Sequence, residues 1–156
     1  MANYKRVFLD GYSYFITIVT YKRQPLLIDN IELLRKSFAL SKKKYAYNID
    51  AIVVLPDHLH MIITPKNAND YSNIVAHIKR SFVYGLEQSY RDYAKTIISS
   101  SQYKRKLAGI WQKRFYEHTI RNEEDWLEKI EYIRSNSVKH KLVDNWQDWK
   151  YSSFVK

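Results

Sequence analysis

The sequence predicts an α+β fold with an antiparallel sheet. Segments rich in β-branched and aromatic residues alternate along the chain with segments of helical periodicity, which indicates strands and helices in one unit. Two short apolar runs flank Pro56 and Asp57, a pair typical of a tight turn in a hairpin. With 156 residues and 46% hydrophobic composition, the chain is large enough for one core, so we expect one domain over residues 1–156.

This prediction rests on seven segments of the sequence. Four have the alternation or the β-branched richness of strands, and they are residues 12–21, 49–55, 58–64 and 110–121. Three have apolar residues at helical spacing, and they are residues 28–48, 74–88 and 123–136. Asp29 or Asn30 can cap the first helix, and Asn122 can cap the last.

The segments follow the order strand, helix, strand, strand, helix, strand, helix. A βαββαβ order is typical of the ferredoxin-like split βαβ arrangement, an antiparallel sheet with helices on one face, here followed by an added C-terminal helix. The polar, basic stretch from Asp92 to Gly109 lacks a clear period, so we expect a mobile loop there. The aromatic tail, which carries Trp146 and Trp149, is expected to pack back on the body of the domain.

Basic residues exceed acidic residues by 26 to 16, which gives a formal net charge of +10 at pH 7. Charge of this size, spread along the whole chain, favours a polyanionic partner, and nucleic acid is the natural one. Any single cluster can equally be a solvated face. The basic residues that we consider candidates for DNA binding are Lys79, Arg80, Lys113, Arg114 and Lys139.

The chain contains no cysteine, so any bound metal must be held by nitrogen and oxygen ligands rather than by thiolates. No apolar run approaches the roughly 18 residues that a membrane span needs. The amino terminus also lacks the apolar core and small-residue cleavage site of a signal peptide. We therefore expect a soluble cytoplasmic protein.

Two histidines, His58 and His60, lie one residue apart in the third predicted strand. Side chains alternate along a strand, so both point to one face, while Leu59 and Met61 point to the other and can be core. The histidine Cα atoms would be about 7 Å apart, which lets the two imidazoles converge on one ion. The competing interpretation is a solvated pair with no function.

The last predicted helix carries a second candidate set. Trp126, Ile130 and Ile133 mark its core stripe, and Tyr132 and Asn136, four residues apart, share a face on the flank of that stripe. A helix that only packs on the sheet does not require a tyrosine hydroxyl next to an amide oxygen that could serve as a metal ligand. With 14 tyrosines in the chain, however, this spacing also arises by chance, so the residues leave both interpretations open.

Three stretches, "VVLPDHLHMI", "IWQKRFYEHTIRNEEDW" and "EYIRSNSVKHKLV", together resemble the REP-associated tyrosine transposases, a branch of the IS200-like single-tyrosine HUH transposases. HUH denotes two histidines that flank a usually apolar residue, here Leu59. The resemblance implies that His58, His60 and Asn136 hold a divalent metal, Mg²⁺ or Mn²⁺. It also implies that Tyr132 is the nucleophile.

The function implied by this resemblance is that of a metal-dependent single-stranded DNA endonuclease and strand transferase. It would act on REP-type hairpins through a covalent 5′-phosphotyrosine, in the bacterial cytoplasm at the nucleoid, as a monomer or a homodimer. Tyr116 is not the expected nucleophile, because the family fills a similar position with other aromatics. Ser137 and Lys141 replace a proline and a glycine common in the family, so the exit of the last helix is expected to be less rigid.

Two other functions remain open at this point. The first is a non-catalytic module that binds single-stranded nucleic acid on the same kind of sheet. The second is a metal-dependent nuclease that uses water and forms no covalent intermediate. A DNA adduct that survives SDS would separate both from the tyrosine mechanism.

Overall fold

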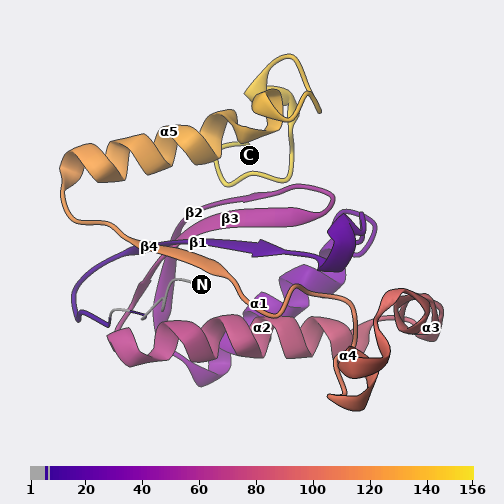
Figure 1. Cartoon of the computed structure of the whole chain (residues 1–156). Helices are drawn as coiled ribbons and strands as arrows, with labels where there is room; N and C mark the ends of the chain where they lie inside the picture. The colour runs from indigo at the N-terminus through magenta and orange to yellow at the C-terminus, as the bar shows by residue number, and fades with distance from the viewer. Residues whose placement is uncertain (1–5, 7) are drawn as a thin grey trace.

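The sheet has four antiparallel strands in the order β2-β3-β1-β4. The structure is a computed structural model, of which we describe residue 6 and residues 8–156 (Figure 1). The strands are β1 (Tyr14–Val19), β2 (Tyr47–Val54), β3 (His58–Pro65) and β4 (Tyr116–Thr119). The predicted class, mixed helix and antiparallel sheet, is confirmed. β3 lies between β1 and β2, the two strands that the first helix connects.

The helices cover both faces of the sheet. α1 (Ile31–Lys44) and α2 (Tyr71–Gly85) pack side by side on one face, and α5 (Glu123–Lys139) crosses the other (Figure 1). The expectation of helices on one face therefore holds for α1 and α2, whereas the added C-terminal helix takes the opposite face. None of the described helices combines the length and apolar composition needed to cross a membrane.

Each face of the sheet has its own core because side chains alternate along the strands. Leu59, Met61 and Ile63 of β3 enter a large cluster with α1 and α2. Ile62, on the other face, enters a smaller cluster under α5 that includes Ile133. The predicted split of the third strand, with Leu59 and Met61 in the core, is confirmed.

The segment from Asp92 to Gly109 was expected to be a loop, and that expectation is wrong. Two short helices occupy most of it, α3 (Gln88–Ile97) and α4 (Ser100–Lys104). Ala94 of α3 is buried and the partly buried Tyr90 packs against the main core, so α3 has an apolar stripe that begins before Asp92. α4 is held by a capping box, in which Ser99 and Gln102 exchange side-chain and backbone hydrogen bonds.

The last strand is shorter than residues 110–121. Within residues 110–121, only β4 pairs regularly with β1. Upstream of β4, Trp111 makes a single bridge to Thr20. Asn122 caps α5 as predicted, since its side chain accepts the Asp125 N–H. Asn30 stands at the N-cap of α1 but donates instead to the Leu26 carbonyl.

The aromatic tail packs on the body, as expected. Trp149 Nε1 donates to the Val54 carbonyl at 2.9 Å, and Ser152 forms a bridge to Val53. Between them, the Val54 N–H donates to the Tyr151 carbonyl. The tail therefore lies along β2, with the 3₁₀ turn Trp146–Asp148 between it and α5.

Candidate active site

The two histidines of β3 lie on the face of the sheet that α5 covers. Their side chains are almost fully enclosed, with 4% of His58 and 5% of His60 exposed, so the interpretation as a solvated pair is wrong. The hairpin turn explains their position. The Leu55 N–H donates to the His58 carbonyl across Pro56 and Asp57, which starts β3 at His58.

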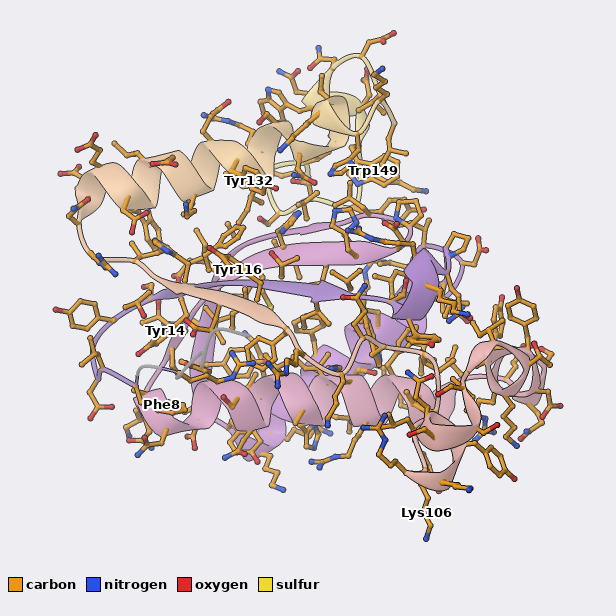
Figure 2. The ribbon with its side chains drawn as sticks, in the orientation of Figure 1. Phe8, Tyr14, Lys106, Tyr116, Tyr132 and Trp149 are labelled. Atoms are coloured by element: carbon orange, nitrogen blue, oxygen red, sulfur yellow. The ribbon has the colours of Figure 1, made fainter. Side chains whose placement is uncertain are left out.

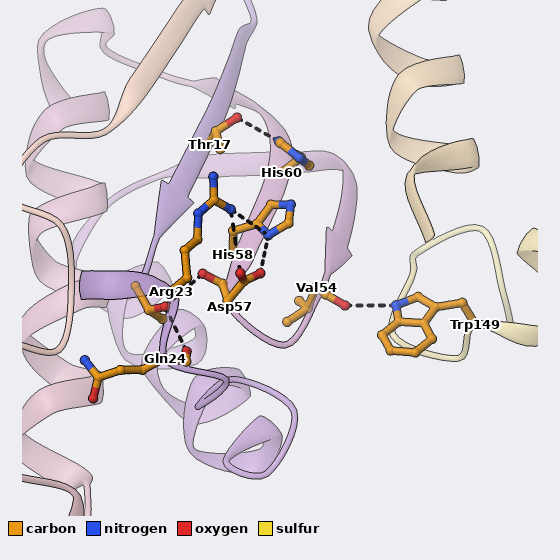
Figure 3. A network of polar contacts seen from close by, with 9 residues as sticks. Thr17, Arg23, Gln24, Val54, Asp57, His58, His60 and Trp149 are labelled. Atoms are coloured by element: carbon orange, nitrogen blue, oxygen red, sulfur yellow. Dashed lines mark hydrogen bonds and ion pairs between the residues drawn. The ribbon is translucent and has the colours of Figure 1, made fainter. Parts of the chain in front are cut away.

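Hydrogen bonds orient both imidazoles. The Asp57 carboxylate accepts from His58 Nδ1 at 2.6 Å, and the Arg23 guanidinium lies 3.7 Å from the other oxygen of that carboxylate (Figure 3). Thr17 Oγ1 lies 2.7 Å from His60 Nδ1, while the buried Nε2 atom of His60 has no hydrogen-bond partner among the described residues. Partners on Nδ1 leave Nε2 free, the arrangement that a metal-ligating histidine needs.

A third histidine lies beside the pair. The ligand atoms of His58, His60 and His140 are all within 4.8 Å of one another, and the ring centroids of His58 and His140 are 4.9 Å apart. Burial, together with the neighbouring His58, lowers the pKa of His60 to about 3 and also lowers that of His140. Both rings are therefore neutral at neutral pH and keep a lone pair for a metal. These three residues can form a metal site.

Sequence reasoning missed His140. It stands at the C-cap of α5, where its N–H donates to the Asn136 carbonyl one turn earlier. The available signal was its position in "VKHK", four residues after Asn136, where the helical spacing continues.

Tyr132 reaches the histidines from α5. Its ring centroid is 5.1 Å from that of His60 and 5.6 Å from that of Phe15, and its side chain points from the helix toward the sheet (Figure 2). Phe15 also stacks on His60 at 5.6 Å, so the same ring positions both side chains. The Lys139 ammonium lies 4.7 Å from the Tyr132 ring centroid, which provides a positive charge beside the phenol.

Asn136 is fully buried, and neither its Oδ1 nor its Nδ2 atom has a hydrogen-bond partner among the described residues. A buried polar atom without a partner costs about 1–3 kcal/mol, and such atoms are uncommon in folded proteins. The Oδ1 oxygen and the His60 Nε2 nitrogen are chemically suited to a divalent ion. These atoms without hydrogen-bond partners therefore fit the divalent metal that the family resemblance implies.

Tyr116, the other tyrosine considered, lies on β4 with 56% of its side chain exposed. Its ring centroid is 6.3 Å from that of Phe15, in a T-shaped arrangement. Phe15 thus separates its environment from that of Tyr132, which contacts His60 directly.

The predicted DNA-binding residues fall into two places. Lys139 is beside Tyr132, whereas Lys79, Arg80 and Lys113 line a separate cavity and Arg114 is exposed nearby in the chain. The Lys79 ammonium donates to the Gln112 carbonyl at 2.8 Å, and burial lowers the pKa of Lys79 to about 8. Lys79 therefore ties the segment before β4 to α2.

The fold and this chain's sequence together define a DNA-processing enzyme of the transposase class. The chain belongs to the IS200-like transposases, because the model of that family matches residues 9–136, a range that includes the histidine pair, Tyr132 and Asn136. The family predicted from the sequence is confirmed.

Among its relatives are the REP-associated tyrosine transposases. The chain is 33% identical over 156 residues to the REP-associated tyrosine transposase of Escherichia coli (strain K12), covering 99% of this chain and 83% of that protein. It is 37% identical, over 99% of this chain and 86% of the relative, to a Haemophilus influenzae protein whose name assigns it to the same group. A solved REP-associated tyrosine transposase bound to a REP hairpin matches with a TM-score of 0.79 and 32% identity, over 99% of this chain and 83% of that one.

Proposed function

We propose that this protein cuts and rejoins single-stranded DNA next to REP-type hairpins, with Tyr132 as the nucleophile. The observation that carries the proposal is the contact of the Tyr132 ring with His60, whose Nε2 atom has no protein partner in the described chain. The hairpin substrate is suggested by the relative whose structure contains a REP hairpin. The net charge of +10 agrees with a DNA partner.

We assign His58, His60 and Asn136 as the residues that would hold a divalent ion, Mg²⁺ or Mn²⁺. When bound, such an ion supplies charge neutralisation and orientation of the scissile phosphodiester. Burial keeps His60 neutral by lowering its pKa to about 3, and hydrogen bonds to Asp57 and Thr17 orient His58 and His60. The side chain of Asn136 offers an oxygen that no protein group occupies.

The residues of the chain can carry the transfer step. The phenol oxygen of Tyr132 attacks the phosphorus, the bond from phosphorus to the 3′ oxygen breaks, and the phenol proton is passed on so that the released strand ends in a 3′-hydroxyl. Phenols ordinarily have a pKa near 10. The ammonium of Lys139 beside the ring stabilises negative charge at the attacking group.

The product of this step is a 5′-phosphotyrosine, which retains the energy of the broken phosphodiester. A 3′-hydroxyl from the same or another strand can attack it, release the phenol and restore a DNA bond without ATP. This reversibility distinguishes a strand transferase from a nuclease that uses water. Membership in a transposase family favours it over both the nuclease and the non-catalytic binding module.

The decisive experiment follows a labelled single-stranded REP-type hairpin with flanking sequence, in Mn²⁺ or Mg²⁺, on an SDS gel. We expect a protein–DNA adduct. Its rate of formation should fall at least about a thousandfold in Tyr132→Phe, because the nucleophile is gone. Tyr116→Phe is the matched control and should form the adduct normally. An adduct that persists in Tyr132→Phe would refute the assignment of the nucleophile.

The proposed metal ligands are tested separately, by calorimetry. We expect the His58→Ala, His60→Ala double variant to lose Mn²⁺ binding, and unchanged affinity would refute the ligand assignment. Asn136→Ala should weaken Mn²⁺ roughly 10- to 100-fold. His140→Ala should instead weaken Zn²⁺ more than Mn²⁺, because three imidazoles suit the borderline-soft ion.

A further inference from the structure

A cavity of about 990 Å³ lies away from the histidines, between α2, α4 and the segment that leads to β4. Its volume is at the upper end of the range for ligand sites. Much of its wall is apolar, with contributions from Val83, Leu107 and Ile110. The candidate active site makes no use of this space.

All the charged residues that line the cavity are cationic. Lys79, Arg80, Arg91 and Lys113 line the cavity, and its lining residues include no carboxylate. Lys79 is engaged with two backbone carbonyls, but the buried Nε of Arg91 has no hydrogen-bond partner among the described residues. A cationic wall without counter-charges favours an anionic occupant.

Aromatic rings accompany these cations. Tyr84, at the rim on α2, is 86% exposed, a large value for a ring with no packing role. Trp111 lies deeper, and its Nε1 donates to the Lys79 carbonyl. Exposed aromatic faces interleaved with positive charges are the platform on which unpaired nucleobases stack.

The cavity is joined to the candidate active site by a three-residue turn, η1 (Tyr21–Arg23). Tyr21 lines the cavity and donates to Gln102 of α4, whereas Arg23 pairs with Asp57 beside His58. Lys22 and Arg23 have φ of 51° and 55°, a left-handed conformation that is unfavourable for residues other than glycine.

The turn is also fixed to the wall of the cavity. The Gln24 amide donates both to the Tyr21 carbonyl and to the Gly109 carbonyl, at 2.8 and 2.7 Å. The strained turn therefore has a defined position between the two sites. A strand held at one site has only this turn to cross before it reaches the other.

We propose that the cavity binds an unpaired base, with its neighbouring phosphates, of the single strand that flanks the DNA hairpin. The base stacks on Tyr84 and enters the apolar space, while Arg80, Arg91 and Lys113 contact phosphates. The strand then passes over η1 toward Tyr132. This inference rests on the proposed function, because it takes DNA as the substrate.

The first test measures equilibrium binding of a fluorescent hairpin oligonucleotide with a single-stranded flank, without metal. Every protein carries Tyr132→Phe, so cleavage plays no part. We expect Tyr84→Ala to weaken binding roughly 5- to 100-fold through loss of one stacking contact. Tyr103→Ala is the matched control, since Tyr103 is 65% exposed on α4 and does not line the cavity, and it should change the affinity less than twofold.

A second pair of variants tests the phosphate contacts. Lys113→Glu and Lys104→Glu change the net charge equally, but Lys113 lines the cavity and Lys104 does not. We expect the Lys113 variant to lose more affinity and to show the smaller salt dependence. Equal effects of Tyr84→Ala and Tyr103→Ala, or of the two lysine variants, would overturn the proposal and assign the cavity to another occupant.

An abasic scan of the flank then identifies the base. We expect one abasic position to weaken binding to the Tyr132→Phe protein and to have little further effect with Tyr84→Ala, since both changes remove the same contact. Strictly additive effects would contradict the inference. If the parent protein does not bind the hairpin at all, the proposed function fails, whereas normal binding with an unaffected Tyr84→Ala variant refutes the cavity alone.

Discussion

The two faces of the sheet differ in what they bury. On the face of α1 and α2, β3 presents Leu59, Met61 and Ile63 to a large apolar cluster. On the face of α5, the same strand presents His58 and His60. One strand of alternating side chains thus serves packing on one side and a polar site on the other, and we expect mutations on the two faces to affect different properties.

The largest stability effect should come from the α1 face. Leu34→Ala removes a side chain of α1 that is 1% exposed, and we expect unfolding free energy to fall by about 2–5 kcal/mol through lost burial and the remaining cavity. Denaturant titration measures the change. Leu127→Ala on α5, where the side chain is 58% exposed, is the control and should be near neutral.

At denaturant concentrations below its unfolding midpoint, the Leu34→Ala protein is folded and should still form the DNA adduct. The reason is that Leu34 lies in the cluster that excludes the histidines. If adduct formation is lost while the fold is retained, the division of roles between the faces is wrong.

The opposite sign is expected on the α5 face. Asn136→Leu replaces a buried amide that has no hydrogen-bond partner in the described chain, so we expect stability to rise by about 1–2 kcal/mol. The same change should weaken Mn²⁺ binding in calorimetry, because it removes the oxygen that we propose as a metal ligand. A destabilised Asn136→Leu protein would show that the amide has a structural role instead.

A smaller, pH-dependent effect concerns the attachment of α5 to the sheet. His118 of β4 lies 2.7 Å from the Asp125 carboxylate of α5. Burial alone raises the pKa of Asp125, but the hydrogen bonds from His118 and from the Arg121 N–H outweigh it and hold the pKa below its ordinary 3.8. The unfolded chain then binds the proton more readily, so this stabilisation is present above pH 3.8 and is lost as pH falls through the lower, folded pKa.

We therefore expect Asp125→Asn to lower unfolding free energy by about 1 kcal/mol at pH 7. The difference from the parent should shrink as the pH falls below 3.8. Glu128→Gln, on an exposed position of the same helix, controls for the loss of a negative charge. A difference that is independent of pH would exclude this ion pair as the cause.

The sequence predicted what periodicity controls. Alternation in β3 placed His58 and His60 on one face, and the helical period with the Asn122 cap predicted α5. The position of α5 over the histidines was not accessible, because it depends on contacts between distant segments, such as Phe15 with Tyr132. Spacing could put Tyr132 and Asn136 on one face but could not say which sheet face they meet.

Two omissions have a common cause. α3 has a short apolar stripe, Tyr90, Ala94 and Ile97, but it begins before Asp92, so the stretch from Asp92 to Gly109 contains only the end of that pattern. α4 buries no residue. His140 stands at the end of α5, where capping rather than the apolar period decides the backbone. Elements held by caps and by packing at their ends leave a weak pattern in the amino-acid sequence.

The contact of Tyr132 with His60 has a kinetic consequence. Both residues come from one polypeptide, and α5 is fixed at its start by Asp125 and beyond its end by Trp149. Dilution cannot separate two halves of a site that are parts of one molecule. The rate of adduct formation per protein molecule should therefore stay constant as the protein concentration is lowered, whereas a site completed by a second subunit would lose activity.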